Sequence, residues 1–198
     1  MSKPQWIAFS GDHPVAEGGP RDVARQLKLA ADAGAERQIL IFDADTGAPL
    51  DIDLRGSVED VLARLPDAVG AAPAPADDPA RRGPGRPRLG VVAREITLLP
   101  RHWDWLATQP GGASVAIRKL VESARETHAA KDRARRASEA AFRFATAMAG
   151  NRPHYEDAMR ALFAGDREGF EAMTEGWPVS IRDHTRRLAT PAFDPPRP

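Results

Sequence analysis

A segment rich in Ala, Pro, Gly and Asp, at residues 67–90, most constrains what this 198-residue chain can fold into. It carries too few apolar side chains to build a core, and its clustered prolines stiffen it. We therefore expect a linker here, which separates an N-terminal domain at residues 1–66 from a mostly helical remainder. The length allows one medium domain or two or three small ones.

The N-terminal residues combine strand and helix signals, which predicts a small α+β domain. Three short apolar runs have the character of strands: residues 6–10, 38–42 and 50–54. Asp45-Thr-Gly-Ala-Pro49 lies between the last two runs and predicts the turn of a hairpin. Residues 21–34 carry apolar side chains at helical spacing. Ser57, with Asp60 three residues later, is typical of a helix N-cap.

The chain has no net formal charge, but its charges are unevenly distributed. The Lys/Arg and Asp/Glu counts are 7 and 14 in residues 1–80, 13 and 5 in residues 81–136, and 8 and 9 in residues 137–198. A basic segment between acidic and neutral ones is expected when only that segment meets a polyanion. A solvated, Arg-rich helix face is the simpler explanation for three of these arginines: Arg133, Arg135 and Arg136.

The end of the linker, Pro84-Gly-Arg-Pro-Arg88, resembles the core of an AT-hook. Gly and Pro add little bulk, so such a backbone can enter a narrow minor groove, where Arg86 and Arg88 would lie along the floor. Arg82 would add a phosphate contact. An ordinary Pro/Gly/Arg linker remains the alternative, because short motifs often match by chance.

Residues 91–127 predict a short strand followed by two helices. Inward positions at Ile96 and Leu98 alternate with polar ones, and Gln109-Pro-Gly-Gly112 separates the two helices. Trp103 and Leu106 are expected to face inward on the first helix. Ser114 is the expected N-cap of the second helix. The apolar face of that helix is expected to consist of Ile117, Leu120, Val121 and Ala124.

This pattern resembles a ribbon-helix-helix DNA-binding domain, in which strands from two chains pair and lie in the major groove. The resemblance implies an intertwined homodimer. It also implies that Glu95 and Thr97 point toward base edges, and that the backbone N–H groups of Ala113 and Ser114 meet a phosphate. Arg94 falls on the inward phase, which places it at the dimer edge or indicates another register. A plain helical hairpin remains the alternative.

Residues 128–190 predict a helical C-terminal region, followed by a Pro-rich tail at residues 191–198. A long helix is expected from Ala129 to about Ala149, where Gly150-Asn-Arg-Pro153 ends it. Two or three short helices are expected after it, over residues 154–163, 167–173 and 180–188. Their aromatic side chains are more typical of a core than of a ligand site, so an interaction or oligomerisation module is the simplest interpretation.

No pattern in the chain favours catalysis. Cysteine is absent, and the five histidines lack metal-ligand spacing. Asp43 and Asp45 are better explained as turn residues. We therefore expect no enzyme, no cofactor and no metal site, and nothing identifies a small-molecule effector. Without a signal-peptide run or a stretch of transmembrane length, we expect a cytoplasmic protein that does not contact a membrane.

The whole chain resembles a bacterial family of uncharacterised proteins, domain of unknown function 2239. The resemblance rests on the order of an acidic head, a Gly-Arg-Pro linker, Val91-Val-Ala-Arg-Glu-Ile-Thr-Leu-Leu-Pro-Arg-His-Trp103 and Trp177-Pro-Val-Ser-Ile-Arg-Asp-His184. It is strongest over residues 85–125 and 170–188, and it implies a bacterial source but no activity.

The leading hypothesis is a dimer that binds double-stranded DNA, either as a transcriptional regulator or as a nucleoid-type protein. The alternative is an interaction or oligomerisation module that does not bind nucleic acid. A small-ligand or enzymatic role for the N-terminal domain is the least favoured possibility.

Overall fold

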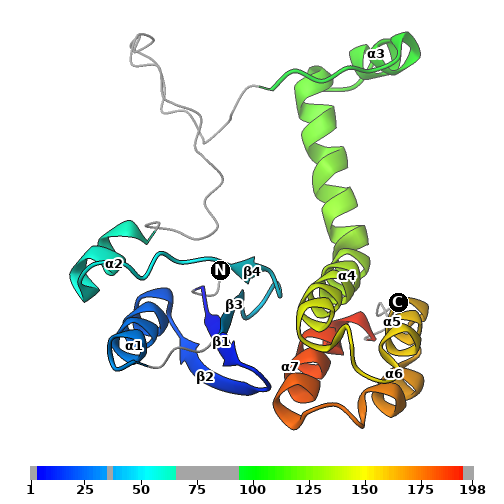
Figure 1. The fold of residues 1–198 in the computed structure, drawn as a ribbon. Coiled ribbons are helices and arrows are strands. Elements are labelled where there is room, and N and C mark those ends of the chain that lie inside the picture. The colour runs from blue at the N-terminus through cyan, green and yellow to red at the C-terminus, as the bar shows by residue number, and fades with distance from the viewer. Residues whose placement is uncertain (1–3, 35–37, 66–93, 194–198) are drawn as a thin grey trace. The chain divides into compact units, whose positions relative to one another are not determined.

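The computed structural model describes residues 4–34, 38–65 and 94–193 (Figure 1). The chain divides into two compact units. The core unit contains residues 1–70 and 130–198, and the hairpin unit contains residues 71–129. The expected linker at residues 67–90 lies outside the described residues.

The core unit contains a four-stranded antiparallel sheet with the order β2-β1-β3-β4 (Figure 1). Its strands are β1 (Trp6–Ser10), β2 (His13–Gly18), β3 (Ile39–Asp43) and β4 (Pro49–Leu50). The strands predicted at residues 6–10 and 38–42 are confirmed. Strand β2 was not predicted, because it contains Pro14 and only one buried side chain, that of Ala16.

The strand predicted at residues 50–54 is wrong beyond Leu50, where the ladder with β3 ends. Ile52 and Leu54 instead pack against the cluster formed by helices α1 (Pro20–Asp32) and α2 (Val58–Arg64). The expected hairpin turn is present. In it, Oδ1 of Asp43 accepts hydrogen bonds from the backbone N–H groups of Asp45 at 3.1 Å and Thr46 at 2.8 Å.

Helix α2 begins with the capping box that the sequence predicts. The Ser57 hydroxyl accepts from the Asp60 backbone N–H at 3.1 Å, and the Asp60 carboxylate accepts from the Ser57 backbone N–H at 2.9 Å. Two orphan donors of the first turn are thereby satisfied, so α2 has a defined start despite its seven-residue length.

Strand β1 is buried on both faces, which explains why it is apolar throughout. Successive side chains of a strand point to opposite faces. Trp6 and Ala8 pack with Val23 and Leu27 of α1, whereas Phe9 belongs to the larger cluster formed with the C-terminal helices. The sheet of the core unit is therefore covered by α1 on one side and by C-terminal helices on the other.

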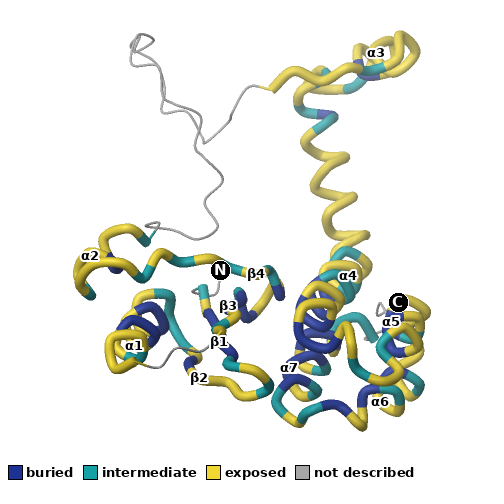
Figure 2. Tube along the Cα trace, in the orientation of Figure 1, coloured by how far each residue is buried: buried dark blue, intermediate teal, exposed yellow. Residues whose placement is uncertain are grey.

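Helix α4 runs without a break from Gly112 to Ala149. The prediction of separate helices on either side of residue 127 is wrong. No Gly or Pro occurs between Ala113 and Ala149, so nothing in the backbone interrupts the hydrogen-bond ladder. The predicted stop at Gly150 is confirmed. Figure 2 shows that buried positions concentrate in the second half of this helix.

Three short helices complete the core unit and confirm the C-terminal prediction: α5 (Tyr155–Ala164), α6 (Arg167–Thr174) and α7 (Val179–Ala189). A single 3-10 turn, η1 (Thr190–Ala192), follows. Trp177 is buried at the corner before α7, and its indole Nε1 donates to the carbonyl oxygen of Pro153 at 3.0 Å.

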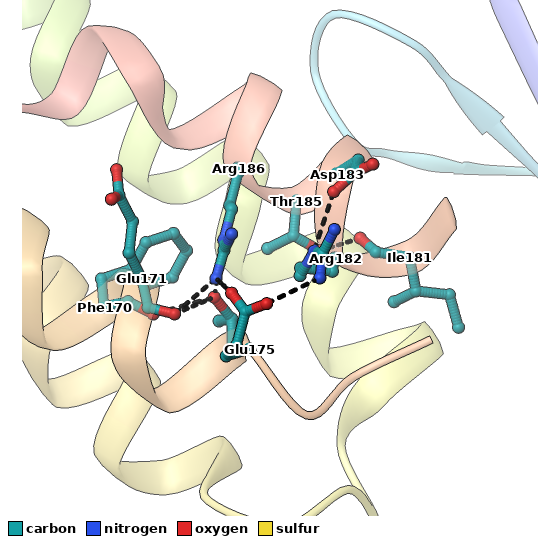
Figure 3. Close-up of polar contacts among 9 residues, drawn as sticks. Phe170, Glu171, Glu175, Ile181, Arg182, Asp183, Thr185 and Arg186 are labelled. Carbon is teal, nitrogen blue, oxygen red and sulfur yellow. Dashed lines mark hydrogen bonds and ion pairs between the residues drawn. The ribbon is translucent and has the colours of Figure 1, made fainter. Parts of the chain in front are cut away.

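A polar network joins α6 to α7 (Figure 3). The carboxylate of Glu175 accepts from Arg182 at 3.0 Å and from Arg186 at 2.9 Å. Arg186 also donates to Thr174 Oγ1 at 2.9 Å and to the backbone carbonyl of Glu171. Hydrogen bonding from Arg186 and the positive charge of Arg182 lower the pKa of Glu175. Much of segment 170–188, where the family resemblance is strong, therefore has a structural role.

Candidate nucleic-acid interface

The segment that was expected to form a DNA-reading strand, residues 94–99, carries no strand or helix in the structure. Arg94, Glu95 and Thr97 are all exposed. Among the described residues, no backbone hydrogen bond involves residues 94–98. The strand predicted here is therefore not present in the structure.

Two helices follow, joined by a short turn. Helix α3 (Pro100–Ala107) begins with Pro at its first position, which suits the missing N–H there, and α4 begins at Gly112 after a short turn. Both Gly111 and Gly112 have positive φ, of 87° and 75°, so a side chain at either position would strain the turn. The sequence signal Gln109-Pro-Gly-Gly112 therefore correctly locates the separation of the two helices.

The start of α4 differs from the prediction at Ser114. The helix begins two residues earlier, so Ser114 lies inside the first turn and is not its N-cap. Its backbone carbonyl accepts from Nε of Arg118 at 3.2 Å, and its side chain is exposed. Ala113 is half-buried beside it. These residues belong to the first turn, where helix N–H groups lack intrahelical partners.

Few apolar side chains of the hairpin are buried within one chain. Leu106 faces inward as predicted and is buried, together with Ala116. Trp103, predicted to face inward, is 43% exposed. Trp105, which the helical-hairpin alternative would place with Trp103 in a core or an interface, is 50% exposed. The large apolar side chains that stay exposed are Ile96, Leu99, Trp103, Trp105, Leu120 and Val121.

We call these six residues the apolar face of the hairpin unit. Each of these large apolar side chains is more than 40% exposed. Exposed apolar surface is a feature of interaction sites when it is extensive. Figure 2 shows α3 and the first half of α4 as mostly exposed. The sequence signal for this face was the helical spacing of Leu120 and Val121 with Ile117 and Ala124.

The hairpin itself is only weakly basic. Residues 94–129 contain five Lys/Arg and four Asp/Glu, so most of the positive surplus of residues 81–136 lies on either side of them. Arg82, Arg86 and Arg88 contribute on the N-terminal side, and they lie outside the described residues. Phosphate contacts from the hairpin alone would therefore be few.

Across residues 4–34, 38–65 and 94–193, no group of three or more His, Cys, Asp or Glu side chains is placed to hold a metal ion. None of the helices described is long and apolar enough to cross a membrane. Asp43 and Asp45 form a hairpin turn, as described above.

The fold defines an α+β protein with a small antiparallel sheet and a mostly helical remainder. The chain belongs to a bacterial family described as "Uncharacterized protein conserved in bacteria (DUF2239)", whose model matches residues 5–189. No curated protein and no solved structure matches the chain significantly. The family match spans the sheet, the hairpin and the C-terminal helices.

Proposed function

We propose that this protein is a homodimer that binds double-stranded DNA. The apolar face of the hairpin unit would form the dimer contact, and residues 94–99 of two chains would pair as a ribbon. The arginines before this segment would hold the phosphates and the minor groove. The observation that carries the proposal is an exposed, unpaired segment immediately followed by two helices whose apolar side chains are uncovered.

The dimer part of the proposal is supported by the small number of buried side chains in the hairpin unit. With only Leu106 and Ala116 buried among its described residues, one copy has almost no core of its own. Two antiparallel copies would cover Leu120 and Val121 and would also provide the strand partner that residues 94–99 lack. One intertwined dimer contact would thus cover the exposed apolar side chains and pair the backbone of residues 94–99.

The DNA part is supported by charge and by residue type. Thr97 and Glu95 can hydrogen-bond base edges, but Glu95 also repels phosphates. With four acidic side chains against five basic ones in residues 94–129, affinity would come mainly from Arg86 and Arg88. We therefore propose binding of low sequence specificity that depends strongly on salt.

The dimer is tested by sedimentation of the full chain. The wild type is expected to be dimeric at micromolar concentration, and the Leu120→Glu/Val121→Glu variant is expected to be monomeric. Leu29→Glu is the matched control, because Leu29 is equally exposed, at 55%, but lies on α1 in the core unit. A monomeric wild type would overturn the proposal.

DNA binding is tested by fluorescence anisotropy with A·T-rich and mixed duplexes at two salt concentrations. The Arg86→Ala/Arg88→Ala variant should bind more weakly and reduce the salt slope by up to about 2, since each positive charge that neutralises DNA from the minor groove would release up to about 0.9 counterions. The control Arg25→Ala/Arg160→Ala removes the same charge from the core unit. A stable wild-type dimer without binding at low salt would instead favour the oligomerisation module, for which the apolar face is the specific evidence.

A further inference from the structure

A surface pocket of about 520 Å³ opens on the core unit, among residues that the proposed function does not use. Helix α4 contributes Arg133, Arg136 and Arg143, and helix α7 contributes Arg187. Among the residues that the structure describes, two acidic ones line the same pocket, Glu17 and Asp45. Four guanidinium groups against two carboxylates leave an excess of two positive charges.

Two of these arginines are anchored by the protein. Nε and Nη2 of Arg143 donate to the carbonyl oxygen of Thr46, at 3.1 and 2.7 Å, in the turn that follows β3. Both Nη atoms of Arg187 lie 3.2 Å from the carboxylate of Glu17. Their positions are therefore set by contacts between distant parts of the chain, which pre-organises one side of the pocket.

The other two arginines have no such partner. Among the described residues, neither Arg133 nor Arg136 forms an ion pair or a hydrogen bond through its guanidinium. Arg135 on the same helix differs, because it pairs with Glu139 at 2.9 Å and with Asp132 at 3.6 Å. The acidic side chains of α4 thus pair with Arg135, outside the pocket, and not with Arg133 or Arg136, which line it.

The spacing on α4 explains how these side chains gather. Residues three and four apart share a helix face, so Arg133, Arg136 and Arg143 lie along one stripe with Ala137 between them. The pocket wall also includes apolar residues, among them Leu188 and Pro191. A site with planar cationic donors and an apolar wall suits an oxyanion attached to a less polar body.

We propose that this pocket binds a small phosphorylated molecule that carries at least two negative charges. Arg133 and Arg136 would donate to the phosphate oxygens, and the anchored Arg143 and Arg187 would complete the positive rim. A pocket of this size is within the range of roughly 300–1,000 Å³ for small-molecule sites. The ligand would act on the core unit, separately from the DNA contact proposed for the hairpin.

The test is isothermal titration calorimetry of the full chain, with ADP and inorganic pyrophosphate as probes. The wild type is expected to bind ADP, and pyrophosphate should compete for the site. The Arg133→Gln/Arg136→Gln variant should bind ADP about tenfold more weakly or worse, since charge-assisted hydrogen bonds are lost. Circular dichroism would check that its fold is retained.

The matched control is Arg135→Gln/Arg160→Gln, which also removes two positive charges but none that lines the pocket. It should leave ADP affinity within about twofold, because charges outside the pocket are screened. Absence of ADP binding at low salt, equal weakening in both variants, or failure of pyrophosphate to compete would each overturn the proposal. A further result would also overturn the proposal: neither ADP nor pyrophosphate binds, and the Arg133→Gln/Arg136→Gln variant loses duplex DNA binding. These arginines would then contact DNA.

Discussion

Nη2 of Arg187 lies 2.7 Å from Nδ1 of His184, which is buried against the rings of Phe9 and Phe144. A guanidinium has no acceptor, so Arg187 donates and Nδ1 accepts. The proton of neutral His184 is then on Nε2, a buried atom without a hydrogen-bond partner among the described residues. The imidazole is thereby held in a single neutral tautomer.

This arrangement predicts that the protein loses stability in mild acid. Burial, with a smaller contribution from the charge of Arg187, lowers the pKa of His184 from 6.5 to about 4. Between these values the unfolded chain binds a proton that the folded chain excludes, so stability falls as the pH decreases. By pH 5 the loss relative to neutral pH is about 2 kcal/mol.

The measurement is urea unfolding of the wild type and His184→Phe between pH 5 and 7.5, a range that largely avoids carboxyl titration. The dependence on pH should be much weaker in His184→Phe and should persist in His13→Gln, which alters an exposed histidine of β2. An identical slope in the wild type and His184→Phe would contradict the prediction.

Truncation of Phe144 is expected to destabilise the protein, because its ring joins the sheet to the C-terminal helices. Its centroid lies 5.0 Å from that of Phe42 and 5.5 Å from that of Phe9. Phe144→Ala should reduce the free energy of unfolding by about 3–5 kcal/mol, as is typical for deletion of a buried aromatic ring. Chemical denaturation followed by circular dichroism measures this loss. Phe163→Ala, at a ring that is 59% exposed, is the control and should cost much less.

Gly47 predicts a steric effect at the turn between β3 and β4. It has a φ of 63°, and a Cβ there would overlap the carbonyl oxygen of Ala140 in α4 and lie 3.3 Å from Cβ of Phe144. Gly11 has a similar φ of 56°, but a Cβ there would meet nothing within 4 Å.

Gly47→Ala should therefore lower the melting temperature well beyond Gly11→Ala, which carries only the cost of about 1 kcal/mol for the left-handed backbone. Calorimetry of both variants measures the difference. Equal shifts would show that α4 does not approach this turn closely.

Arg186 predicts a loss of stability when the network between α6 and α7 is broken. Arg186→Met keeps much of the apolar stem but removes the donors to Thr174 and Glu175, and should cost about 1–2 kcal/mol. Arg160→Met removes an exposed pair with Asp157 and should have little effect. Thermal unfolding of the two variants, compared with the wild type, separates a structural network from a surface ion pair.

Local patterns in the sequence predicted the elements that local physics determines. The capping box at Ser57, the helix stop at Gly150 and the three C-terminal helices all depend on residues within a few positions of one another. Strand β2 escaped prediction because its pattern is mostly exposed. The division of α4 into two helices was predicted without a Gly or Pro to cause it.

Contacts between distant residues could not be predicted in the same way. The hydrogen bonds from Arg143 to Thr46 join residues 97 positions apart, and no periodic pattern in the sequence indicates them. In the sequence, Arg133 and Arg136 have the pattern of an ordinary solvated face, as Arg135 does. Only the position of the sheet beside α4 shows that Arg133 and Arg136 line a pocket, whereas Arg135 pairs with acidic side chains. Residues 94–99 form no strand in the structure, although their alternating pattern predicted one.

The core unit is built from two segments that are far apart in the sequence, and this has a consequence for synthesis on the ribosome. Phe9 and Phe42 emerge long before Phe144, the ring that covers them. At about 5–20 residues per second, roughly 5–20 s pass between the appearance of Phe42 and that of Phe144. During that interval one side of the nascent sheet has no native cover. Because a nascent chain with such a surface is a target for chaperones, the order of translation makes the first third of this protein dependent on its last.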